Sequence, residues 1–160
     1  MAASSPRKLR PRTASRLAAV QALYQLEQAG GPADPVIDEF VRHRLVADPV
    51  ADGGVPGADV PLFAAIVRGW AGRAEALDSA IAAALAEGWP LARLDPVLRA
   101  LLRAAASELF DAAGAPARVV IDQYMEVAHG FFGPEEPRFA NGVMNHLARS
   151  LRPAEFATSA

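Results

Sequence analysis

The sequence predicts an all-α fold of six or seven helices. Apolar residues recur at helical spacing along most of the chain, and no segment of useful length alternates between apolar and polar residues as a β-strand does. Apolar residues make up 52% of the 160 residues, which is enough for a sizeable core, and there is no cysteine. Disulfides, thiolate metal sites and cysteine nucleophiles are therefore excluded together.

Four segments organise the first half of the chain. The first predicted helix ends at Gly30-Gly31, and a second, short helix is expected from about Pro35 to Leu45. Residues 47–61 are rich in Gly, Pro and Asp, which indicates a flexible loop or linker. The helical period restarts at Leu62 and continues to Gly88, either as one long helix or as two joined near Gly69–Gly72.

Three further helices are predicted in the second half. Asp95-Pro96 is a good helix start, with Asp as the N-cap and Pro in the first turn, and Gly114 ends this helix. The next helix runs from Pro116 to Gly133-Pro134 and is apolar on more than one face, so we expect it to be central. The last helix is expected to begin near Pro137 and to end by Pro153.

The charge is distributed unevenly along the chain. Five cations and no acid lie in residues 1–16, namely Arg7, Lys8, Arg10, Arg12 and Arg16. We therefore expect a flexible basic arm at 1–13, two helical subdomains at about 14–88 and 89–152, and a tail at 153–160. A basic arm on an acidic body is typical of a segment that binds a polyanion, with an ordinary solubilising terminus as the alternative.

No catalytic or metal-binding pattern is found. His43, His129 and His146 have no histidine at i+4, so a zinc site is not expected, and neither is a cofactor. Glu108 and Glu126 lie in apolar helices and are expected to form structural ion pairs, with Arg103 or Arg118 as candidate partners. The chain has no secretory signal and no apolar run near the roughly 18 residues of a membrane span, so we expect a cytoplasmic protein and no membrane contact.

Three stretches, in this order along the chain, resemble the NusB family of bacterial transcription antitermination factors. They are "RTASRLAAVQALYQ" (residues 12–25), "RLDPVLRALLRAAASEL" (93–109) and "PARVVIDQYMEVAHGFFGPEEPRFANGVMNHLAR" (116–149). The most specific is the last, in which "RFANGVM" follows an apolar helix and a short acidic loop. The chain departs from the family pattern at Leu98, Asp122-Gln123, Pro137 and Ala140, which lie in or near surfaces that can face partners.

The resemblance implies a factor that binds the boxA element of nascent ribosomal RNA and suppresses premature termination. The implied partners are NusE, the other Nus factors and RNA polymerase, and a homodimer is possible. Single-stranded RNA is held by cations along its phosphates and by aromatic faces under its bases. The five arm cations are the phosphate-binding candidates, and motif position adds Gln21, Tyr24, Arg138, Phe139 and Asn141.

Some of these assignments have alternatives. Tyr24 and Phe139 also lie on apolar stripes, so each is either an RNA-facing or a core residue. Glu135 and Glu136 are candidates for partner binding and also favour the start of the last helix through its dipole.

Asn141-Gly142 is a strong turn signal that here falls within the pattern of a helix. We expect both residues in the first turns of the last helix. Gly142 is then explained by another helix that passes close to it. Asn141 would bond to that neighbouring helix or to RNA.

Two other functions remain open. The chain could be the NusB-like RNA-binding domain of a ribosomal RNA methyltransferase, although no nucleotide-binding domain accompanies it within the 160 residues, so no enzymatic activity is expected. Alternatively, it could be a helical adaptor that binds only proteins, with an incidental basic arm.

Overall fold

The computed structural model describes residues 9–45, 55–86, 88–111 and 113–157. Arg7, Lys8 and much of the loop predicted at 47–61 lie outside them. Within the described residues there are no strands and six α-helices: α1 (Pro11–Ala29), α2 (Ala33–Glu39), α3 (Val60–Ala84), α4 (Pro96–Phe110), α5 (Ala117–Phe131) and α6 (Glu135–Leu151). The predicted all-α fold is confirmed.

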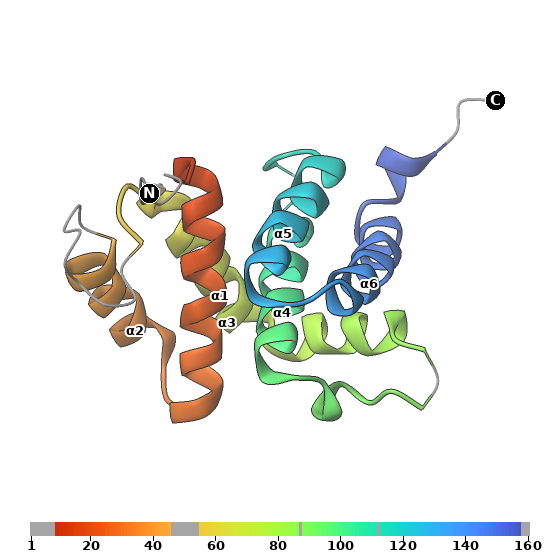
Figure 1. Ribbon diagram of the computed structural model, residues 1–160, viewed down its shortest axis with the longest axis horizontal. Coiled ribbons are helices and arrows are strands. Elements are labelled where there is room, and N and C mark those ends of the chain that lie inside the picture. Colours follow the sequence, from red (N-terminus) through yellow and green to blue (C-terminus); the bar gives the residue numbers. More distant parts are fainter. Residues whose placement is uncertain (1–8, 46–54, 87, 112, 158–160) are drawn as a thin grey trace, which may run out of the picture.

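Helix α4 is the centre of the molecule. It contacts α1, α3, α5 and α6, and every residue from Leu98 to Leu109 except Arg103 is buried. The apolar pattern predicts α5 as the central helix, but α5 leaves Val119 and Phe131 exposed. Figure 1 shows α5 between α1 and α6, with α4 behind it.

The ends of α4 are fixed by side chains. The Oδ1 atom of Asp95 accepts hydrogen bonds from the backbone N–H groups of Val97 (2.8 Å) and Leu98 (3.2 Å), which confirms the predicted N-cap. At the other end, the buried guanidinium of Arg152 donates to the carbonyl oxygens of Glu108 (2.9 Å) and Leu109 (2.7 Å). The last carbonyls of a helix lack their usual partners four residues later, so Arg152 caps α4 from beyond the end of α6, together with the N–H of Asp111, which donates to Glu108 at 3.2 Å.

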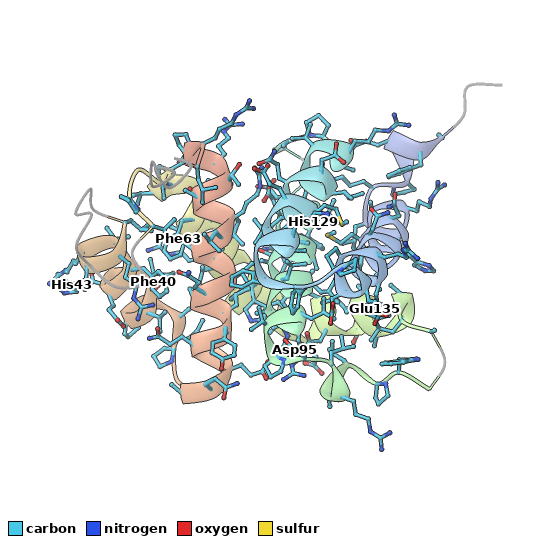
Figure 2. All side chains as sticks on the ribbon, in the orientation of Figure 1. Phe40, His43, Phe63, Asp95, His129 and Glu135 are labelled. Atoms are coloured by element: carbon cyan, nitrogen blue, oxygen red, sulfur yellow. The ribbon has the colours of Figure 1, made fainter. Side chains whose placement is uncertain are left out.

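Helix α3 is long and bent. The Oδ1 atom of Asp59 accepts from the backbone N–H of Leu62 at its start, and the backbone leaves helical geometry at Arg73, next to Gly72. Helix α2 is only seven residues long and passes into a π-helical turn, Phe40–Arg44. Phe40 of this turn stacks on Phe63 of α3 with ring centroids 5.4 Å apart, which joins α2 to α3 (Figure 2).

The glycine expected to mark a close helix contact is not Gly142. That residue is exposed, and a Cβ added to it would meet nothing within 4 Å, so the prediction was wrong. A close approach occurs instead at Gly69, where a Cβ would lie 2.7 Å from Oγ of Ser107 on α4. Asn141 is also exposed, and its backbone O and its Oδ1 accept from Nδ2 of Asn145 one turn later.

The division into subdomains near residue 88 stays a prediction. Helix α3 contacts α1 and α2 but also α4 and α6, so it spans both halves. Short 3₁₀ turns at Leu91–Arg93 and Pro153–Phe156 flank the C-terminal helices. In the part of the chain that the structure describes, no helix is long and apolar enough to cross a membrane.

Candidate nucleic-acid interface

The described cations of the basic arm fall into two groups. Arg10 and Arg12 are exposed where α1 begins, whereas Arg16 is only 2% exposed. Nε and Nη2 of Arg16 donate to the two carboxylate oxygens of Glu108, at 2.8 and 2.6 Å. Arg16 is therefore bound within the protein, and its assignment as a phosphate ligand was wrong.

The Arg16–Glu108 pair is completed by a third buried group. The hydroxyl of Tyr124 donates to Oε1 of Glu108 at 3.1 Å. Burial acts to lower the pKa of Arg16, but the hydrogen bond and charge of Glu108 outweigh it and raise that pKa. Burial, with the negative charge of Glu108, raises the pKa of Tyr124 well above its usual value. An ion pair was expected for Glu108, but with Arg103 or Arg118 rather than with Arg16.

Other polar contacts tie the first turn of α1 to its neighbours. Oγ1 of Thr13 donates to Oε1 of Gln123 on α5 at 2.5 Å, and Oγ of Ser15 donates to the carbonyl of Asp59 at 2.6 Å. A hollow of about 480 Å³ lies beside this turn and is lined by residues that include Arg10 and Arg12. Two exposed guanidinium groups are thus held at the edge of a concave surface.

A second concave surface lies farther along α1. Gln21 and Tyr24 line a hollow of about 670 Å³, with Phe131 of α5 among its other lining residues. Tyr24 is 38% exposed, so it is not a core residue. Phe131 is 41% exposed and was missed, because in the sequence it continues the apolar pattern of α5. Its position as the last residue of the helix, next to Phe132 and the Gly133-Pro134 stop, was the available signal.

The remaining candidates lie at the start of α6, on the other side of α5 from α1 (Figure 1). Arg138 is exposed, whereas Phe139 is half-buried and packs against Trp89 with ring centroids 6.1 Å apart. Trp89 is 58% exposed and was not singled out from the sequence, although it stands in a Gly-Trp-Pro loop.

The two acidic candidates for partner binding lie in the first turn of α6. Glu135, labelled in Figure 2, is exposed, and Glu136 is half-buried. Both are therefore near Arg138 and Phe139 along the helix, and the structure does not place them with the arm.

The other strong ion pairs hold helices together. Glu27 of α1 accepts from Arg99 and from Arg103 of α4, and Arg103 also pairs with Asp78 of α3 at 2.9 Å. The hydrogen bond from Arg99 lowers the pKa of Glu27. Among the described residues, no group of three or more His, Cys, Asp and Glu could hold a metal ion.

Comparison with known proteins gives the family. The model of the NusB family matches residues 13–149. A transcription antitermination protein NusB of Granulibacter bethesdensis is 57% identical over 155 residues, which cover 94% of this chain and 95% of that protein. The protein of the same name from Gluconobacter oxydans is 48% identical over 142 residues and 88% of each chain.

Solved structures show the same fold. NusB of T. maritima superposes with a TM-score of 0.72 at 26% identity, over 92% of this chain and 99% of its own. A crystal structure of antitermination factors NusB and NusE in complex with dsRNA matches with a TM-score of 0.71 at 20% identity, over 86% and 96%. The family match, the identities and the shared helical fold agree, and the chain belongs to the NusB family of transcription antitermination proteins.

Proposed function

We propose that this chain binds a boxA-type single strand in nascent ribosomal RNA, together with NusE, and suppresses premature termination by RNA polymerase. It acts in the cytoplasm, without a cofactor and without catalysing a reaction. The observation that carries this proposal is the set of exposed side chains that α1 presents: the guanidinium groups of Arg10 and Arg12 at its start, and the ring of Tyr24 about three turns later.

The arrangement suits a flexible single strand. Exposed arginines at the start of α1 would hold phosphates, and the exposed aromatic side chains would lie under unstacked bases. Of the arm cations, Arg7, Lys8, Arg10 and Arg12 remain candidates, because Arg16 is paired with Glu108. Arg138 and Asn141 are exposed on α6 and would contact a strand that extends past α5.

A basic ribosomal protein suits the rest of the surface. After the five arm cations are set aside, the chain has 11 basic and 18 acidic residues, which leaves the body with a net charge of −7. Glu135 and Glu136 are the proposed contacts for NusE, at the start of α6. The relatives that are transcription antitermination proteins, and the solved complex of NusB and NusE with dsRNA, support these partners.

A titration with boxA RNA tests the proposal. The chain should bind boxA RNA more tightly than a scrambled strand of the same composition, and addition of NusE should increase the difference. A double variant, Arg10→Ala with Arg12→Ala, should bind both RNAs more weakly and keep its helicity. A double replacement of Arg42 and Arg68 by Ala gives the charge-matched control, because both side chains are exposed and paired, with Asp38 and with Asp34. Equal affinity for the two RNAs, with or without NusE, would exclude boxA recognition.

A further inference from the structure

The groove between α1 and α5 carries a set of side chains suited to one nucleobase. Two hollows, of about 670 and 300 Å³, share Gln21 and Phe131 in their linings. The smaller hollow is also lined by Leu9, where the chain leaves the basic arm. A strand held by the arm would therefore reach Gln21 directly.

The Oε1 atom of Gln21 is buried and has no hydrogen-bond partner within the described structure. Gln25, one turn later, differs: its Nε2 donates to Glu39 at 3.1 Å and its Oε1 accepts from Arg44 at 3.3 Å. Buried acceptors are rarely left unpaired, so Oε1 of Gln21 is available to accept a hydrogen bond from an N–H group of a ligand.

Two aromatic side chains line the same hollow as this amide. Tyr24 is on the same helix, Phe131 ends α5, and both side chains are about two-fifths exposed. An exposed ring offers a face on which any base can stack. An amide offers an acceptor and a donor side by side, which matches the 6-amino group and ring nitrogen of adenine.

We infer that Gln21 reads one adenine of the bound RNA, stacked against Phe131. The inference rests on the proposed RNA binding and adds to it a base, a recognition group and a stacking residue. The amide of Gln21 turns its Oε1 atom toward the 6-amino group and donates from Nε2 to a ring nitrogen. The adenine thereby supplies the partner that Oε1 lacks in the free protein.

The lining of the larger hollow favours a base over a peptide side chain. It includes Gln21 and Gln28, whose uncharged amides can hydrogen bond to a base edge, and Gln25, whose amide is bonded to Glu39 and Arg44. Among the described residues that line it, the charged one, Arg44, is paired with Glu39 at 3.3 Å. The cations that would hold the adjoining phosphates, Arg10 and Arg12, stand where α1 begins, beyond Leu9.

A scan of the RNA tests the inference. Each adenine of a boxA strand is replaced in turn by purine riboside, which lacks the 6-amino group. At one position the wild-type chain should lose about tenfold or more in affinity. In Gln21→Leu the same replacement should have no effect, because the group that reads the amino group is gone.

The aromatic contact has a matched control. Phe131→Leu should weaken boxA binding by about tenfold, as expected for the loss of base stacking. Phe110→Leu should not, because Phe110 is similarly exposed, at 44%, but ends α4 and packs against Arg73. Thermal unfolding of each variant shows that the fold is intact.

The outcomes separate this inference from the function on which it rests. A wild-type chain that does not prefer boxA overturns both. A clear boxA preference overturns only the inference about Gln21 if no purine riboside replacement lowers the affinity of the wild-type chain. The same holds if the replacement still lowers the affinity of Gln21→Leu. If Gln21→Leu and Phe131→Leu lose affinity for NusE but keep their affinity for RNA, the groove binds a protein partner, and the inference is overturned as well.

Discussion

Removal of Glu108 should strongly destabilise the fold. In Glu108→Leu the guanidinium of Arg16 stays buried without its carboxylate, and the hydroxyl of Tyr124 loses its acceptor. Breaking a buried ion pair from one side costs about 3–5 kcal/mol, because an uncompensated charge remains inside the protein. That is a large part of the roughly 5–15 kcal/mol by which a domain is stable.

Urea unfolding followed by circular dichroism measures this loss. With a slope of about 2 kcal/mol per M, the midpoint should fall by about 2 M. The double variant Arg16→Met with Glu108→Leu should recover most of the loss, since no buried charge is left. Glu126→Leu is the control, because Glu126 is exposed on α5 and its replacement should change the stability by less than about 0.5 kcal/mol. A loss below about 1 kcal/mol for Glu108→Leu, or a double variant no more stable than the single one, would refute the reasoning.

Three further changes test the packing and the electrostatics. Gly142→Ala should raise the free energy of unfolding by about 0.5–1 kcal/mol, because the added methyl meets nothing and alanine favours a helix; a loss in urea unfolding would contradict this. Gly69→Ala should lower the free energy of unfolding by about 1–3 kcal/mol, because the added methyl group meets Ser107. An unchanged melting temperature would argue against close packing at Gly69. Because Arg99 lowers the pKa of Glu27, the carboxylate stabilises the fold above its ordinary pKa of 4.5, and this contribution is lost as the pH falls through the lowered value. Glu27→Gln should therefore make the free energy of unfolding fall less steeply below pH 4.5 than in the wild type, as measured by denaturation at a series of pH values. An equally steep fall would contradict the stabilising role of the Glu27 carboxylate.

The helices could be predicted from local sequence because their signals are local. Asp95-Pro96 starts α4 through a cap that involves only its own first turn, and the spacing of leucines gives the period. The bend of α3 falls next to Gly72, where helix propensity is low. Helix α6 begins at Glu135 rather than near Pro137, a shift of two residues that is usual for helix ends.

The site was harder to predict because burial depends on residues that are distant in sequence. Arg16 looks like the other arm arginines, and only Glu108, 92 residues later, makes it a structural residue. Gly69 and Gly142 differ in whether a neighbouring helix crosses them, which the sequence does not state. The exposure of Tyr24 and Phe131 likewise follows from how α1 and α5 pack, since both residues lie on apolar stripes.

The salt dependence of boxA binding tests the central claim most directly. Four arm cations remain candidates for phosphate contacts, Arg7, Lys8, Arg10 and Arg12, because Arg16 is buried. For single-stranded RNA, the slope of log K against log salt should then be about −2.8, and boxA should stay tighter than the scrambled strand throughout the series. A slope near zero, or equal affinity for the two strands at every salt concentration, would contradict the account.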